Sequence, residues 1–312
     1  MLAFTIYWHV FEDFYYQYSP YSVNGSNVKL KPTTTRSGRP RSMTAEQCLA
    51  FELAWGRSAG PTSFLSLVFG VTASVMTLFP CFDRCLLVLV LKGDTKDQVN
   101  LPTSSEISRL QDAIGANYPL LSSVYAIMDG LKLRLQASDH SEIQNMFYNG
   151  WTHDHYVSNV FAFSPERLII ACALNAPGCM HDSQIAEWEN VYAKLERFHQ
   201  YTGGQVVVDS TFSKGTNDFL LKSGEDVALP TAIRREVTAL RQSAEWGMRA
   251  LQAAFPRLED RLKYGERGER KCILLSIVLL FHLRTHLVGL NQILPAFYSS
   301  TIGRTANELF CN

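Results

Sequence analysis

The sequence predicts an α/β fold in which helices flank a mixed β-sheet and a small helical region precedes it. Two observations carry this prediction. From residue 120 onward, short apolar runs rich in β-branched residues alternate with longer amphipathic segments, as expected for strands interleaved with helices. Before residue 100, apolar residues follow the period of short helices that are separated by glycine-containing turns.

The composition is that of a globular protein without an overall electrostatic bias. The chain has 312 residues, of which 46% are hydrophobic and 19% charged, so it can form one large core and a smaller module. The formal net charge is zero, and any contact with nucleic acid must therefore come from local basic patches. The seven cysteines lack the spacing of a zinc site and predict reduced, mostly buried thiols.

Neither a secretory signal nor a membrane span is predicted. The first 21 residues are aromatic and acidic, without the charged start and cleavage site of a secretory signal. The apolar stretch at 272–294 is interrupted by His282, Arg284 and His286, so it predicts a buried helix. We therefore expect no membrane partner.

Residues 1–42 are predicted to form an N-terminal segment that ends in a turn-rich, basic linker. The Gly-Arg-Pro-Arg run at 38–41 resembles the core of an AT-hook, in which arginines enter a narrow minor groove. A flexible basic linker is the alternative interpretation. The candidate DNA contacts in this segment are Arg36, Arg39 and Arg41.

A small helical region is predicted over residues 43–100. The run that begins at Thr44 has the pattern of a helix capping box, and apolar residues follow it at helical spacing. A short helix, a turn at Gly70 and a second helix that opens with small polar residues resemble a helix-turn-helix. Thr72 and Ser74 would then contact DNA, although an ordinary helical hairpin fits the local pattern equally well.

The main α/β domain is predicted over residues 120–295, after a polar loop at 93–119 and before a C-terminal tail at 296–312. Its predicted strands are 124–128, 146–151 with 156–163, 168–174 and 206–208. Its predicted helices are 182–198, 234–255 and the buried stretch at 272–294. The second helix has a core face formed by Val237, Leu240, Ala244, Gly247 or Met248, Leu251, and Ala254 or Phe255.

Three acidic residues predict metal-assisted chemistry. Asp129 and Asp209 end apolar runs that predict buried strands, and Glu245 lies on a predicted helix with 35 residues between it and Asp209. Carboxylates are costly to bury, and three that converge repel one another unless cations neutralise them. Oxygen ligands from different elements favour Mg²⁺ or Mn²⁺, and two such ions can activate a water or a 3′-hydroxyl for attack on a phosphate.

Two candidate acids, Glu245 and Asp182, also have simpler interpretations. Glu245 lies one turn from both Arg241 and Arg249, which fits a salt-bridged helix edge. Alternatively, these arginines would contact phosphate or orient Glu245. Asp182 is a candidate fourth metal ligand with His181 beside it, but Asp182 or the residue after it also fits the cap of the following helix.

Further basic residues are candidate contacts to the DNA backbone. Lys132 and Arg134 follow the first acid, and a second basic cluster lies near the end of the predicted domain. That cluster comprises Arg257, Arg261, Lys263, Arg267, Arg270 and Lys271. Acidic residues are interspersed in it, so a solvated face is an equal alternative. His153 and His155, spaced as alternate residues of a strand, fit either a metal site or a solvated hairpin.

Six segments within residues 43–290 resemble, in their order, the DDE superfamily endonucleases of the PIF/Harbinger transposase type. They are Phe69-Gly70-Val71-Thr72-Ala73-Ser74, Ala126-Ile127-Met128-Asp129-Gly130, Phe147-Tyr148-Asn149-Gly150, Pro177-Gly178-Cys179-Met180-His181-Asp182-Ser183, Val208-Asp209-Ser210 and Arg241-Gln242-Ser243-Ala244-Glu245. The resemblance implies an RNase H-like core in which Asp129, Asp209 and Glu245 bind the metal ions. After Asp209 the chain departs from the Ser-Gly-Tyr-like turn that is usual in this family.

The resemblance further implies that double-stranded DNA is cleaved at transposon ends and that strands are then transferred to a target. In this family DNA recognition is often shared with a separate protein, so we expect a Myb-like partner. We also expect a homo-oligomer and a nuclear location. A catalytically silent, domesticated module that binds DNA or protein is the alternative from another functional class. No phosphate-cradling glycine loop is present, which disfavours a hydrolase for small phosphorylated molecules.

Overall fold

The computed structural model describes residues 18–24, 27–32, 43–59, 61–72, 88, 99–212, 218–222, 229–265 and 267–288. The chain divides into two compact units, each built from several segments. The first unit combines Met1–Gln98, Leu133–Val157 and Leu251–Val288. The second combines Val99–Lys132, Ser158–Ala250 and Gly289–Asn312. The domain boundaries expected from the sequence, at 43–100 and 120–295, stay predictions.

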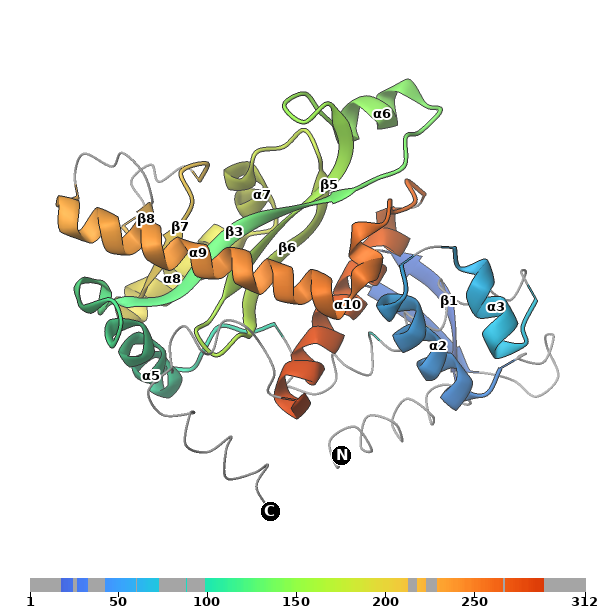
Figure 1. Cartoon of the computed structure of the whole chain (residues 1–312), viewed down its shortest axis with the longest axis horizontal. Helices are drawn as coiled ribbons and strands as arrows, with labels where there is room; N and C mark the ends of the chain where they lie inside the picture. The colour runs from blue at the N-terminus through green and yellow to red at the C-terminus, as the bar shows by residue number, and fades with distance from the viewer. Residues whose placement is uncertain are drawn as a thin grey trace, which may run out of the picture. The chain divides into compact units, whose positions relative to one another are not determined.

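A mixed sheet is centred on β3 (Val124–Arg134), as Figure 1 shows. The other strands are β4 (Tyr148–Asn149), β5 (Asp154–Phe163), β6 (Ile169–Pro177), β7 (Gln205–Val208) and β8 (Leu220–Lys222). On one side of β3, β7 pairs in parallel with it and β8 pairs in parallel with β7. On the other side β5 pairs with β3, and β6 and the short β4 pair with β5.

The direction of β5 follows from its hydrogen bonds. The amide of Leu135 donates to the His155 carbonyl at 2.9 Å, and the Asn159 side chain donates to the Leu131 carbonyl at 3.2 Å. The residue number falls along β3 as it rises along β5 between these two contacts, so β5 is antiparallel to β3. Apart from the short β4, the strands lie in the sheet in the order β6-β5-β3-β7-β8. If these five strands are numbered from one to five along the chain, the order is 3-2-1-4-5. This order and these directions form an RNase H-like mixed sheet, as the sequence predicted.

Helices of the second unit pack on this sheet. They are α5 (Ser104–Gly115), the 3₁₀ turn η2 (Pro119–Leu121), α7 (Asp182–Trp188), α8 (Val191–Thr202) and α9 (Thr231–Ala254). Ile107 of α5, Ile185 of α7 and Leu195 of α8 join Tyr125 and Val208 of the strands in one buried cluster. A fully buried aliphatic side chain of this kind stabilises the fold by about 1.5–3 kcal/mol.

The predicted core face of α9 is confirmed. Its innermost residues, Val237, Leu240 and Ala244, are completely buried, and Met248 and Leu251 continue the same stripe. Because these residues recur at the 3.6-residue helical period, they fix the rotation of α9 about its own axis. The neighbouring Arg241 and Glu245 are therefore held at the edge of the core face and remain partly exposed.

The first unit contains a β-hairpin and four α-helices among its described residues. The elements are β1 (Tyr18–Asn24), β2 (Asn27–Pro32), α2 (Ala45–Arg57), α3 (Ser63–Phe69), α6 (Ser141–Phe147), the 3₁₀ turn η3 (Pro256–Glu259) and α10 (Arg267–Val288). The capping box predicted for α2 is confirmed, since Thr44 and Gln47 exchange hydrogen bonds at 2.9 and 3.2 Å. α3 ends at Gly70 in the left-handed region, at φ 64°.

The structure corrects several predicted elements. The predicted N-terminal segment at 1–42 contains the strands β1 and β2, and the predicted polar loop at 93–119 contains α5. The predicted helix at 182–198 is two helices, interrupted where Asn190 adopts φ 58°. The predicted strand at 146–151 begins as the end of α6, and β8 was not predicted.

Two predicted features cannot be followed in the described part of the chain. The second helix of the helix-turn-helix and the tail at 296–312 lie outside it. The apolar stretch at 272–294 is helical where it is described, within α10. Within the described residues, no helix combines the length and the apolar character that crossing a membrane requires.

Candidate active site

The sheet places two of the predicted acids side by side. β3 and β7 run parallel with Met128 opposite Val208, so Asp129 and Asp209 are the next residues on neighbouring strands. Neighbouring strands lie about 4.8 Å apart, which brings these two carboxylates to one edge of the sheet. Asp129 is 8% exposed, and one of its oxygens accepts a hydrogen bond of 2.7 Å from the Gly130 amide.

The third predicted acid reaches the same place from α9. Arg241 lies one turn before Glu245, and their Nη2 and Oε1 atoms are 3.5 Å apart. The Nη1 atom of the same guanidinium lies 3.3 Å from Oδ1 of Asp209 and 3.8 Å from Oδ2 of Asp129. The carboxylates of Asp129, Asp209 and Glu245 are thus gathered around one arginine.

Asp182 extends this acidic cluster. It is the first residue of α7, and the hydroxyl of Thr211 lies 3.4 Å from an oxygen of Asp182 and 3.4 Å from one of Asp209. The Asp182 carboxyl group also packs on Gly130, where a Cβ would lie 2.6 Å from it. The residue that caps α7 is His181, so Asp182 does not act as the N-cap.

Burial and mutual repulsion control the protonation of the cluster. Burial raises the pKa of Asp129 to about 6, and the charges of Asp209 and Asp182 act in the same direction against the Gly130 hydrogen bond and Arg241. Burial also raises the pKa of Asp182, while Lys132 and Thr211 oppose that shift. Burial and the repulsion between carboxylates therefore both favour the protonated forms of Asp129 and Asp182.

The chemistry of these donors fits a hard divalent cation. All four side chains offer carboxylate oxygens, the ligands that Mg²⁺ and Mn²⁺ prefer, and they come from two strands and two helices. In the present side-chain arrangement, no three His, Cys, Asp or Glu residues in the described ranges have the geometry of metal ligands. The guanidinium of Arg241 contacts the three predicted acids instead.

The other predicted site residues are distributed as follows. Lys132 is exposed on β3, and its charge acts on Asp182. Arg249 is exposed on α9 one turn beyond Glu245, whereas the ion pair of Glu245 is with Arg241. Arg134 belongs to the first unit, where its charge lowers the pKa of Asp154.

The DNA contacts predicted near the N-terminus are mostly outside the described residues. These are Arg36, Arg39, Arg41 and Ser74. Thr72 is described and exposed, two residues after Gly70 ends α3.

Two arginines of the basic cluster near the end of the predicted domain are buried and structural, so these two do not offer free contacts to DNA. Arg257 is 7% exposed, bonds Asp260 at 2.8 Å and donates to the Trp55 carbonyl at 3.2 Å. Arg270 is 3% exposed, and its guanidinium lies 4.8 Å from the centre of the Phe147 ring. Lys263 and Arg267 are exposed, and Lys271 is half-buried.

The two histidines are not alternate residues of one strand. His153 lies in the turn before β5 at φ 53°, where its ring lies 3.2 Å from the Tyr148 hydroxyl. His155 is inside β5 beside Asp154, which is bonded to Arg261. The strand periodicity assumed for this pair therefore does not apply, because His153 precedes the strand that contains His155.

Two residues of the cluster were not singled out from the sequence. Thr211 bridges Asp182 and Asp209, and it follows the strand acid by two positions. Gly130 lets the Asp182 carboxyl group approach the backbone next to Asp129. The signal available for Gly130 was its place directly after a strand acid, where a missing side chain allows close approach.

The cluster lies within a region that matches a known family. Residues 128–281, just under half of the chain, match the model of the DDE superfamily endonucleases. The matched region begins one residue before Asp129 and includes Asp182, Asp209 and Glu245. This match supports the superfamily named from the sequence.

The remaining comparisons are more distant. The crystal structure of a pre-cleavage Mos1 transpososome is 10% identical, with a TM-score of 0.19, over 68% of this chain and 61% of that chain. The Mos1 mariner paired end complex with Mn is 12% identical, with a TM-score of 0.18, over 68% and 60%. The chain spans about three-fifths of the length of those two chains. Their TM-scores are too low to support a fold, so the fold is assigned from the strand order of the sheet. No curated protein matches the chain significantly.

Proposed function

We propose that this chain is a PIF/Harbinger-type DDE endonuclease that cuts phosphodiester bonds of double-stranded DNA with Mg²⁺ or Mn²⁺. The observation that carries the proposal is the meeting of Asp129, Asp209 and Glu245 at a single guanidinium. Cleavage at transposon ends, strand transfer to a target, a homo-oligomer, a Myb-like partner and a nuclear location belong to the same proposal. The match to the DDE superfamily endonucleases supports it.

Each acid has a defined part in the proposed chemistry. Asp129 and Asp209 would hold one ion jointly, Glu245 would complete a second site, and Asp182 is a further ligand. The bound ions would stabilise charge on the attacking and leaving oxygens of the phosphate. Asp129, whose pKa is about 6, must release its proton before it can serve as a ligand.

The other residues of the cluster position these acids. Arg241 keeps three carboxylates together at 3.3–3.8 Å, which are longer contacts than charge-assisted hydrogen bonds of about 2.7–2.9 Å. We infer that Arg241 can exchange these carboxylates for a DNA phosphate at modest cost. Thr211 links Asp209 to Asp182 and so limits the rotation of both side chains.

Nicking of supercoiled DNA in Mn²⁺ or Mg²⁺ tests the proposal. Asp209→Asn should lower the nicking rate by more than about 100-fold, since even residues that only orient metal ligands contribute about 10–100-fold. Asp112→Asn is the matched control, because it makes the same chemical change at an exposed position of α5. If the wild-type protein does not nick, or if Asp209→Asn nicks as fast as the control, the chain is not this nuclease and the silent binding module is favoured.

A further inference from the structure

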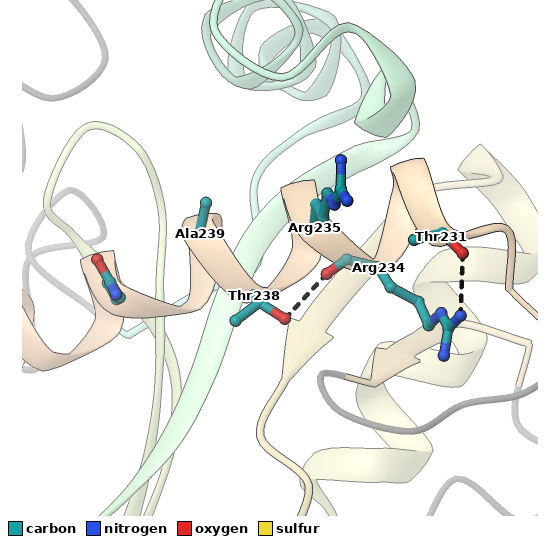
Figure 2. Close-up of a pocket in the computed structure, with 6 residues that line it drawn as sticks. Thr231, Arg234, Arg235, Thr238 and Ala239 are labelled. Atoms are coloured by element: carbon teal, nitrogen blue, oxygen red, sulfur yellow. Dashed lines mark hydrogen bonds between the residues drawn. The ribbon is translucent and has the colours of Figure 1, made fainter.

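The first half of α9 carries a shallow groove on its exposed side, lined by arginine, threonine and glutamine side chains. The groove has a volume of about 530 Å³ and is open to solvent. It is lined by Thr231, Arg234, Arg235, Thr238, Ala239 and Gln242 (Figure 2). The spacing of these residues places them on one side of the helix, away from its buried face at Val237 and Leu240.

The groove has positive charge that no described carboxylate neutralises. Arg234 and Arg235 form no ion pair with an acid in the described ranges, whereas Arg109, Arg241, Arg257 and Arg261 each do. The acid nearest to them in sequence, Glu236, instead accepts a hydrogen bond of 3.0 Å from the Leu120 amide. Two cations in one groove without acidic partners are suited to an anionic ligand.

The donors of the groove fit phosphate oxygens. Nη2 of Arg234 donates to the Thr231 hydroxyl at 3.1 Å, and its buried Nε–H has no hydrogen-bond partner among the described residues. Figure 2 shows the two guanidinium groups extending in different directions from α9, so they flank the stripe between them. Hydroxyl, amide and guanidinium donors of this kind are those that contact the DNA backbone.

The groove continues the line of the acidic cluster along the same helix. Arg234, Arg241 and Glu245 are spaced by seven and four residues, which keeps them on one side of α9. At 1.5 Å per residue, Arg234 lies about 10 Å along the axis from Arg241. Phosphates of one DNA strand advance by about 3.4 Å, so this distance corresponds to roughly three nucleotides.

We propose that this groove binds the sugar–phosphate backbone of DNA about three nucleotides from the bond that is cut at the acidic cluster. The contact is independent of base sequence, because it uses charge and donors that face phosphates. The proposal rests on the proposed nuclease function for the identity of the cut site. The binding of a phosphate backbone by the groove can be measured without cleavage.

The experiment measures duplex binding over a series of salt concentrations by fluorescence anisotropy. Full-length Asp209→Asn protein, without divalent ions, serves as the non-cleaving parent. Arg234→Gln/Arg235→Gln should lower the affinity for unrelated sequences to the same extent. It should also lower the slope of log Kobs against log[salt] by about 1.8, as expected for two lost phosphate contacts. Arg109→Gln/Arg197→Gln is the control, with the same charge change on the exposed surfaces of α5 and α8.

The outcomes separate this proposal from the nuclease proposal. If the slope of log Kobs against log[salt] is the same for Arg234→Gln/Arg235→Gln as for the control, the proposal that the groove binds DNA is wrong. This conclusion holds whether or not the wild-type protein nicks DNA. If the slope is reduced but the wild-type protein does not nick DNA, the groove binds DNA and the nuclease proposal is wrong. Arg235→Gln alone, at an exposed position, should lower the slope by about 0.9, and this single variant guards against misfolding of the double variant.

Discussion

Two arginine–carboxylate groups in this chain, one in each unit, differ in how completely the acids are neutralised. In the first unit, Arg261 donates hydrogen bonds of 2.9 and 2.8 Å to the two oxygens of Asp154 and so lowers the pKa of Asp154. In the second unit, the guanidinium of Arg241 lies 3.3–3.8 Å from the carboxylates of three acids, and burial raises the pKa of one of them, Asp129, to about 6. The first arrangement is a satisfied ion pair, while in the second, burial and neighbouring carboxylates disfavour the ionised form of Asp129, which a bound cation would stabilise.

Replacing one acid from each group should change stability in opposite directions. Asp129→Asn should raise the free energy of unfolding at pH 7 by up to about 3 kcal/mol, since a pKa about two units above normal penalises the ionised folded form. Asp154→Asn should lower it by about 1 kcal/mol, because a partly exposed pair contributes little. Urea denaturation measures both changes. The comparison fails if both substitutions destabilise the protein equally.

The same difference predicts a pH dependence for Asp129. Its folded pKa of about 6 exceeds the unfolded value of 3.8, so its contribution to stability is fully present below about pH 4. That contribution is lost as the pH rises through 6. The free energy of unfolding of the wild-type protein relative to Asp129→Asn should therefore fall by about 3 kcal/mol over this interval. Paired denaturation curves at several pH values test this, and a constant difference would contradict it.

Divalent ions should stabilise only the proteins that retain the acidic cluster. At about 100 times its dissociation constant, Mn²⁺ should raise the free energy of unfolding by about 2.7 kcal/mol. Thermal denaturation with and without Mn²⁺ measures this effect. The wild type and Asp154→Asn should respond, whereas Asp129→Asn and Asp209→Asn should respond little. An equal response in all four proteins would place the ion elsewhere.

Gly130→Ala tests whether the acidic cluster depends on the close approach of the Asp182 carboxyl group to Gly130. The new Cβ would lie 2.6 Å from the Asp182 carboxyl group, so Asp182 must move and the protein should lose about 1–3 kcal/mol. Gly115→Ala is the control, because its Cβ would lie 3.9 Å from the Cα atom of Ser122, at ordinary van der Waals contact. Denaturation of both variants measures the effect, and equal stabilities would show that Asp182 is not held against Gly130.

Local sequence signals identified the elements whose pattern is determined within the segment itself. The core face of α9 was predictable from helical spacing, and the cap of α2 from the residues at Thr44 and Gln47. α5 carries an equally clear capping box from Thr103 to Glu106, together with buried residues at helical spacing. The polar composition of this segment is also typical of a loop, so the capping box and the helical spacing are the signals that identify α5.

Other elements depended on partners that are distant in the sequence. β8 has three residues, and its pairing with Val206 and Val207 of β7 defines it more than its own composition does. The break at Asn190 divides α7 from α8 within a stretch whose apolar period continues through both. A positive φ at one asparagine is permitted locally, but packing of the two helices on the sheet selects it.

The amino-acid sequence by itself determined which acids are available, which strands and helices carry them, and the helical face on which Arg241 and Glu245 lie. Only the tertiary structure decided that Arg241 contacts all three predicted acids, that Asp182 packs on Gly130 and that Arg257 and Arg270 are structural. The reason is physical. Strand and helix periods are local, whereas repulsion, burial and pairing depend on distances between segments that only the folded sheet brings together.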